Sequence, residues 1–181
     1  MKNNCIIFLL LFIISVTALG FTGVNTSETV GVETAQYLRI HIRADSNEQS
    51  AQAVKYLVRD ALVEYLTPIA AECDSVEEAQ AALKRRLPAI ADLGSAVLKE
   101  NGFLYGASAR LCVEQFPTRM YGEFVLPQGE YMALIVELGS GKGDNWWCVA
   151  YPPLCFTVTQ NVVYKSKIVE IISKWKTGKL P

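Results

Sequence analysis

The order of the sequence patterns predicts an α+β fold. We expect an antiparallel or mixed sheet of about four strands, a run of three helices packed on one face, and a disulfide-pinned C-terminal hairpin. An alternating segment at residues 37–43 comes first, three helical segments follow over 46–99, and alternating segments return at 105–116, 131–138 and 146–150. A strand, then helices, then further strands is typical of a sheet whose helices gather on one face. A chain of 181 residues suits one domain.

The first predicted strand is the segment YLRIHIR at residues 37–43. Its apolar residues Leu38, Ile40 and Ile42 alternate with basic residues at the positions between them. Alternation with a period of two indicates a half-buried strand. We therefore expect one face of this strand to be basic and to meet solvent or a partner.

The first predicted helix follows this strand. Ser46 with Gln49 three residues later has the pattern of a capping box, and apolar residues then recur at helical spacing until Pro68. Because proline lacks a backbone donor and restricts the preceding residue, we expect the helix to end there.

Two further helices are predicted after it. Asp74 or Ser75 has the residue type of an N-cap and is followed by two glutamates, which favour a first helical turn. We expect this helix to end near Arg86. Pro88 suits the first turn of a third helix, and Gly102 its stop.

The period of the pattern changes after the helices. Residues 105–116 alternate as a strand, and residues 116–130 are rich in proline and glycine, which indicates a long loop that can hold a short hairpin. Residues 131–138 and 146–150 are the next expected strands. A last helix is expected at 160–176, with isoleucines on one side and lysines on the other.

The N-terminus has the features of an export signal. Lys2 precedes an unbroken apolar run from Cys5 to Ile14, and small residues follow, so that cleavage after Gly20 is expected. An uncleaved anchor is the alternative. The expected divisions are a signal peptide or anchor at 1–20, a flexible spacer at 21–36, one domain at 37–156, and an amphipathic basic tail at 157–181.

The composition favours a globular protein and argues against a nucleic-acid-binding protein. With 51% hydrophobic and 19% charged residues the chain has the composition of a globular protein. Its formal net charge is −1, whereas a nucleic-acid binder carries enough basic residues to neutralise several phosphates. We therefore expect no nucleic-acid partner.

The cysteines are interpreted through this expected export. Cys148 and Cys155 are close in sequence, and a close pair outside the cytoplasm is more often a disulfide than a redox or metal site. Zinc would need two more ligands, and His41 is the only histidine. Cys73 and Cys112 are then either buried thiols or a second bridge.

Three patterns that could carry chemistry are weak. Residues 139–143 resemble a phosphate-binding loop, but Lys142 is followed by glycine and a further strand. His41 lies between two arginines, which disfavour the protonated form that a general base passes through. Glu123 and Glu130 are a commonplace pair of loop acids. We predict no catalytic, cofactor-binding or metal-binding residue.

The adjacent tryptophans Trp146 and Trp147 point to opposite faces if their segment is a strand. We expect Trp147 in the core. The alternative is that helices or the loop at 116–130 cover both faces. The expected exposed patch, which we assign to a protein partner, consists of Trp146, Asn145, Tyr131, Gly129 and Glu130.

One segment resembles a known family. Residues 115–156 contain FPT, YG, PxGEY, LGxGxGxNWWCV and PPLCF in order, and this segment closely resembles the hallmark region of stage II sporulation protein R of endospore-forming bacteria. Residues 38–61 resemble the family's first strand and helix more weakly. Cys73, Cys112 and the tail beyond about residue 157 depart from the shared pattern.

The resemblance implies a signal rather than an enzyme. Proteins of this family are made in the forespore and exported into the space between the two cells. There they trigger a membrane-embedded protease of the mother cell, which cleaves the precursor of sigma E. The C-terminal helix could add a peripheral membrane contact. The alternatives are a secreted cell-wall hydrolase and a membrane-tethered envelope structural factor.

Overall fold

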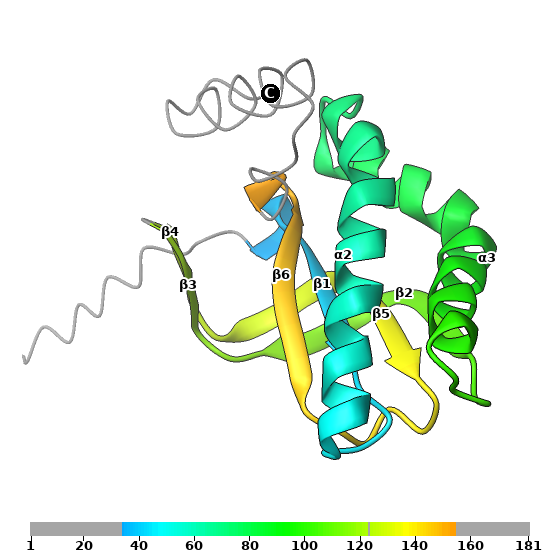
Figure 1. Ribbon diagram of the computed structural model, residues 1–181. Coiled ribbons are helices and arrows are strands. Elements are labelled where there is room, and N and C mark those ends of the chain that lie inside the picture. Colours follow the sequence, from blue (N-terminus) through cyan, green and yellow to red (C-terminus); the bar gives the residue numbers. More distant parts are fainter. Residues whose placement is uncertain (1–33, 123, 155–181) are drawn as a thin grey trace, which may run out of the picture. The chain divides into compact units, whose positions relative to one another are not determined.

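The computed structural model describes residues 34–122 and 124–154. They form an α+β fold in which two α-helices pack on one face of a four-stranded mixed sheet (Figure 1). In chain order the elements are a 3-10 helix η1 (Thr34–Gln36), β1 (Leu38–Arg43), α2 (Gln49–Ala71), α3 (Val76–Glu100), β2 (Ala107–Phe116), β3 (Arg119–Tyr121), β4 (Phe124–Leu126), β5 (Gly129–Leu138) and β6 (Asn145–Tyr151).

The sheet has the strand order β2-β5-β1-β6. β1 runs parallel to β5, and the pairs β1–β6 and β2–β5 are antiparallel. β3 and β4 form a separate antiparallel hairpin, as the proline- and glycine-rich loop predicted. The α+β class and the mixed sheet are therefore confirmed.

The number of helices was predicted wrongly. In the described part of the chain, the second and third predicted helices are one helix, α3, with Pro88 inside it. Leu83 before the proline and Ile90 and Leu98 after it belong to the same buried cluster. A proline in a helix interior costs about 3 kcal/mol. Burial of apolar side chains on both sides of Pro88 offsets this cost and keeps the helix continuous.

The predicted helix ends were partly right. Ser75 caps α3 by accepting from the backbone N–H three residues later at 3.2 Å, and Gly102 follows α3 with a φ of 82°. The predicted capping box at Ser46 is absent from α2, whose N-cap is Glu48 without a side-chain hydrogen bond. Pro68 lies inside α2 rather than at its end.

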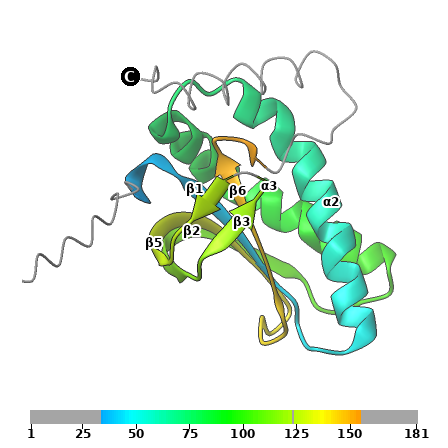
Figure 2. The same cartoon turned by 90° about the vertical axis from the view of Figure 1, so that its left-hand side faces the viewer.

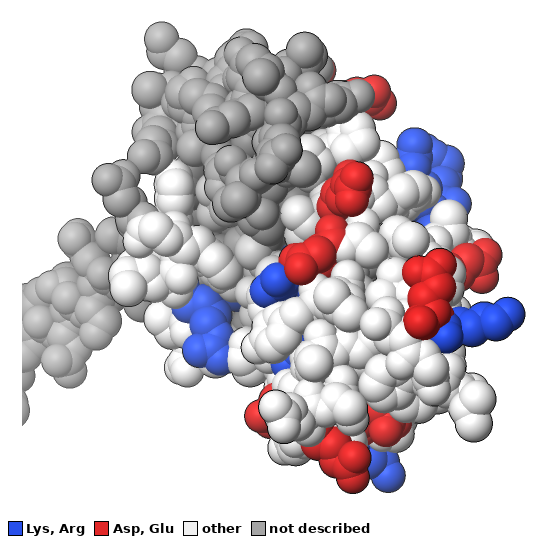
Figure 3. Space-filling view, in the orientation of Figure 1, with Lys and Arg blue, Asp and Glu red and all other residues white. Residues whose placement is uncertain are grey.

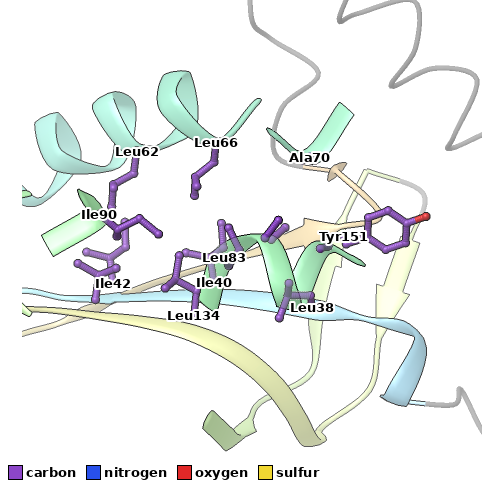
Figure 4. Packing of buried hydrophobic residues seen from close by; sticks show 14 of the residues in the cluster. Leu38, Ile40, Ile42, Leu62, Leu66, Ala70, Leu83, Ile90, Leu134 and Tyr151 are labelled. Atoms are coloured by element: carbon purple, nitrogen blue, oxygen red, sulfur yellow. The ribbon is translucent and has the colours of Figure 1, made fainter. Parts of the chain in front are cut away.

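The main core lies between the two helices and the sheet (Figure 4). Leu62 and Leu66 of α2 point from above toward the sheet, and Ile40 and Leu134 point up from it. This face is fully apolar at its centre, which is what holds the helices on the sheet. Its buried members include Leu38, Ile40, Ile42, Val54, Val58, Leu62, Leu66, Leu83, Ile90, Leu98, Leu134, Val136 and Leu138.

The opposite side of the sheet, here called the second face, carries its own core. The β3–β4 hairpin lies on the side of the sheet away from α3 (Figure 2). The basic side of the first strand was expected to meet solvent or a partner. Within this chain it is buried: Arg39 is 0% and His41 is 5% exposed, because β1 is a central strand. The buried members of this second cluster are Tyr37, Phe116, Leu126, Tyr131, Ala133, Ile135 and Val149.

Several predictions concern residues outside the described ranges. They are the signal peptide or anchor at 1–20, the spacer up to residue 33, the helix at 160–176 and the tail at 157–181. Cys155 also lies outside, and the predicted disulfide-pinned hairpin is not seen among the described residues. Cys73 and Cys112 are free thiols, so the alternative of a second bridge between them is wrong. No helix within 34–122 and 124–154 is long and apolar enough to cross a bilayer.

Candidate functional site

A network of charged side chains crosses one end of the second face. The parallel register places Arg43 of β1 opposite Glu137 of β5, and Arg43 Nη1 donates to Glu137 Oε1 at 2.7 Å. Arg110 of β2 pairs with the same carboxylate, with Nη2 donating to Oε1 at 3.1 Å. Arg43 Nη2 also donates to Glu114 Oε1. Arg43 thus pairs with both carboxylates and Arg110 with one of them, and these opposite charges lower the electrostatic cost of partial burial.

His41 is the buried member of this network. Its Nδ1 lies 2.9 Å from Glu114 Oε2, and its Nε2 lies 2.7 Å from Asn145 Oδ1. Burial lowers the pKa of His41 to about 4, against an opposing hydrogen bond from Asn145, and the nearby charge of Arg43 lowers it further. The ring is therefore neutral at pH 7. Because a carboxylate only accepts hydrogen bonds, the neutral ring carries its proton on Nδ1 and donates it to Glu114. Nε2 is then an acceptor, and it is hydrogen-bonded to Asn145 when the side-chain amide is turned so that its N–H group faces the ring.

This arrangement gives His41 a fixed orientation but no reaction partner within the described residues. Both ring nitrogens are engaged, and no hydroxyl or thiol of residues 34–122 or 124–154 is hydrogen-bonded to the ring. Over the same residues, no group of three histidine, cysteine or acidic side chains is placed to hold a metal ion. The geometry of the network is suited to holding strands together and to presenting charge.

Arg39 occupies an aromatic cage next to the network. Its guanidinium carbon lies 4.3 Å from the ring centroid of Phe116, 4.8 Å from that of Tyr131 and 5.5 Å from that of Tyr121. Nη2 donates to the Tyr121 hydroxyl at 2.8 Å. Nε and Nη1 are buried and have no hydrogen-bond partner among residues 34–122 and 124–154. Aromatic faces attract the cation, but they do not satisfy the donors in the guanidinium plane.

The two tryptophans do lie on opposite faces, but the uses predicted for them differ from the structure. Trp147 is half-buried on the second face, 5.5 Å from the ring of His41, with Arg119 4.2 Å above it. Trp146 is also half-buried and packs against the main core, with Arg59 at 5.9 Å. Trp146 is thus covered from the helix side. The alternative, that both faces are covered, describes the structure better.

The other residues of the predicted patch are not gathered around Trp146. Tyr131 is 1% exposed on the second face, and its hydroxyl donates to the Pro127 carbonyl oxygen at 2.8 Å. Asn145 bonds to the second-face histidine described above. Gly129 and Glu130 lie at the start of β5, where Glu130 is exposed. Tyr131 and Asn145 therefore share a face with Trp147 rather than with Trp146.

The glycine-rich loop at 139–143 is hydrogen-bonded to the loop after β1. Ser140 N donates to the carboxylate of Asp45 at 2.6 Å, and Ser140 Oγ donates to the Asp45 carbonyl oxygen at 2.7 Å. Gly143 N donates to the Ala44 carbonyl oxygen at 2.8 Å. The backbone N–H of Ser140, which in a phosphate-binding loop would bind the ligand, here donates to Asp45. The loop therefore fixes the end of the sheet.

The sequence prediction missed most of the second face. It singled out His41, but not Arg39, Arg110, Glu114 or Glu137. The alternation in residues 107–116 does place Arg110 and Glu114 on one side of their strand. The missing information was the strand order, which brings that side next to the basic side of β1.

Charged residues of both signs are distributed over the side of the molecule that carries α2 (Figure 3). Acidic and basic side chains lie near one another in this view, and much of the surface between them is uncharged. The distinctive electrostatic feature is instead the buried basic group of the second face.

Two comparisons with known proteins find relatives. Residues 34–161 match the family described as stage II sporulation protein R. The chain is also similar to stage II sporulation protein R of Bacillus subtilis (strain 168), with 34% identity over 163 residues, which cover 86% of this chain and 72% of that protein. No solved structure matches. The family match spans every helix and strand that the structure describes.

Proposed function

Since the chain belongs to the stage II sporulation protein R family and so has a role in sporulation, we propose that it is a secreted signal between two cells. It leaves the forespore, reaches the space between the forespore and mother-cell membranes, and activates the membrane-embedded protease that processes the sigma E precursor. The observation that carries this proposal is the family match over residues 34–161. The name of the family refers to sporulation and to no enzymatic activity.

The second face supports a role in binding another protein. Its partly exposed side chains include Arg119, Tyr121 and Trp147, and arginine, tyrosine and tryptophan are enriched in protein interfaces and in their energetic centres. Export to the intercellular space is supported by the apolar N-terminal run of the sequence. In this proposal the folded domain acts by contact with the protease and performs no bond cleavage itself.

The proposal is tested first in a sporulating host. Deletion of the gene should abolish expression of a sigma E-dependent reporter, and the full chain should restore it. A chain with Glu123→Gln and Glu130→Gln should restore it as well, because a signal does not depend on loop carboxylates. Normal reporter activity in the deletion strain contradicts the signalling role. Loss of complementation by the double variant, with normal protein abundance, favours the hydrolase.

Reconstitution tests the direct step. Sealed vesicles that contain the protease and the sigma E precursor are prepared in both orientations, and the purified full chain is added outside. Cleavage is expected only in vesicles whose external surface is the intercellular face of the membrane. Equal cleavage in both orientations, or none in either, contradicts the proposed mechanism. Mass spectrometry of the N-terminus of the cellular protein distinguishes a secreted form from a tethered one.

A further inference from the structure

We propose that Arg39 is the centre of a carboxylate-binding site on the second face, which the Tyr121 side chain covers in this structure. Arg39 is fully buried, and within the part of the chain that the structure describes Nε and Nη1 have no hydrogen-bond partner. A guanidinium has five donors, and buried donors in proteins are nearly always satisfied. A buried cation without a counter-charge destabilises a fold, so its presence here indicates a use outside folding.

The charges of the second face leave Arg39 without a counter-ion among the described residues. Arg43 and Arg110 share the two glutamates of the network, and the buried histidine beside them is neutral at pH 7. Arg39 and Arg119 have no carboxylate within ion-pair distance in the described part of the chain. Counted over the described residues, the face thus has two unbalanced positive charges, and an anionic ligand would neutralise them.

The geometry shows how a carboxylate would enter. Tyr121 is half-buried and contributes a neutral phenol oxygen to Arg39 Nη2 at 2.8 Å. A carboxylate forms a stronger, charge-assisted bond with a guanidinium and can accept from two of its N–H groups at once. Rotation of the Tyr121 side chain would free Nη2, which together with the unpaired Nη1 offers two N–H groups to one carboxylate, while Phe116 and Tyr131 stay against the cation. Arg119, two residues earlier in β3 and half-buried, lies on the same face of that strand.

The carboxylate could belong to an acidic side chain of a partner protein or to a free small acid. Both sources present the same group to Arg39, and the inference stands apart from the proposed signalling role. The test uses the full chain at pH 7 and measures the urea midpoint by tryptophan fluorescence. Sodium acetate is compared with sodium chloride at equal ionic strength, and a hexaglutamate peptide is tested in the same way.

We expect the urea midpoint of the wild-type chain to rise with ligand concentration and then to level off, because a ligand of the folded state stabilises it. Arg39→Met should lose this response, whereas Arg110→Met, which removes an arginine that already has a carboxylate, should keep it. A response to acetate indicates that a free acid is sufficient. A response to hexaglutamate but not to acetate indicates an acidic protein segment.

Two further measurements keep the proposal falsifiable if Arg39→Met folds poorly. Tyr121→Phe removes the competing hydroxyl and should lower the half-saturating acetate concentration severalfold. Saturation-transfer NMR of acetate should show contact with the wild-type chain and lose it in Arg39→Met. Absence of any ligand effect in the wild type overturns the site. So does an unchanged effect in Arg39→Met, or a ligand-free Arg39→Met chain that unfolds at a much lower urea concentration, which would make Arg39 a structural residue.

Discussion

His41 shows how a central strand changes the chemistry of a side chain. Its neighbours in the sequence are arginines, yet its contacts in the fold are Glu114, Asn145 and the ring of Trp147. Burial is the largest influence on its protonation and lowers its pKa to about 4. A histidine that the sequence pattern places on the polar side of a strand is therefore a neutral, oriented part of the second face.

This pKa gives a prediction for stability against pH. The pKa in the folded chain is about 4 and the ordinary value is 6.5, so the unfolded chain binds more protons between these values. The stabilisation is present above pH 6.5 and is lost as the pH falls toward 4. Between pH 7.5 and pH 5 the free energy of unfolding should fall by about 2 kcal/mol because of His41. Urea unfolding measures this fall, and His41→Gln should remove it.

Comparing wild type with His41→Gln separates the effect of histidine titration on stability from that of the acidic groups. Carboxylates titrate in both chains, so the difference in pH dependence between wild type and His41→Gln reports the imidazole. The same fall in both chains between pH 7.5 and pH 5 would mean that His41 is solvated and titrates normally.

The two tryptophans should contribute similarly to stability. Both are half-buried, Trp146 against the main core and Trp147 against the second cluster. Fully buried large aromatic residues cost about 3–5 kcal/mol when truncated to alanine. We therefore expect Trp146→Ala and Trp147→Ala each to lower the free energy of unfolding by about 2 kcal/mol. A Trp146→Ala chain as stable as wild type would restore the earlier assignment of Trp146 to an exposed patch.

At the scale of elements, the sequence predicted those features whose causes are local. The strand β1, the cap at Ser75 and the glycine stop at Gly102 depend on residues close in sequence, and all three are found. The continuity of α3 through Pro88 was not predictable in this way. It depends on burial of both helix halves against strands that are distant in the chain.

The second face shows the same limit for the candidate site. Alternation identified the side of β1 that carries Arg39 and His41, but not whether water or protein covers that side. Coverage results from the order β2-β5-β1-β6 and from the β3–β4 hairpin. The residues of the predicted patch lie on different faces for this reason, since they were assigned to one surface before the faces of the strands were known.

The hydrogen-bonded contact between the loops at 44–47 and 139–144 gives a prediction at the scale of elements. A Cβ on Gly143 would lie 2.3 Å from the Ser46 carbonyl oxygen, so the backbone of one loop must move in Gly143→Ala. We expect this change to lower the free energy of unfolding by about 2–4 kcal/mol, as overpacking and lost loop hydrogen bonds do. Thermal or urea unfolding measures the loss.

Gly129→Ala is the matched control. The nearest atoms to its added Cβ are side-chain carbons at 3.5 and 3.7 Å, which are ordinary contacts. It should change the free energy of unfolding by less than about 1 kcal/mol. Equal losses in the two variants would mean that glycine flexibility, rather than the close approach at Gly143, determines the effect.

At the scale of the whole molecule, one sheet serves two cores. Side chains that alternate along β1, β5 and β6 enter the main core and the second cluster in turn. If these strands separate, both clusters become exposed to water. This shared sheet predicts that the domain around residues 34–154 unfolds as one cooperative unit, in spite of the separate β3–β4 hairpin on the second face.

The adjacent tryptophans allow this to be measured face by face. In a Trp175→Phe background, Trp147→Phe leaves Trp146 as the reporter of the main core, and Trp146→Phe leaves Trp147 as the reporter of the second face. In each variant of the full chain, fluorescence and far-UV circular dichroism should give the same urea midpoint, to within about 0.2 M, because one transition exposes both cores. Measuring both signals on the same sample removes the effect of each substitution on stability. A fluorescence midpoint below the circular dichroism midpoint for Trp147, but not for Trp146, would show that the second face opens before the sheet separates.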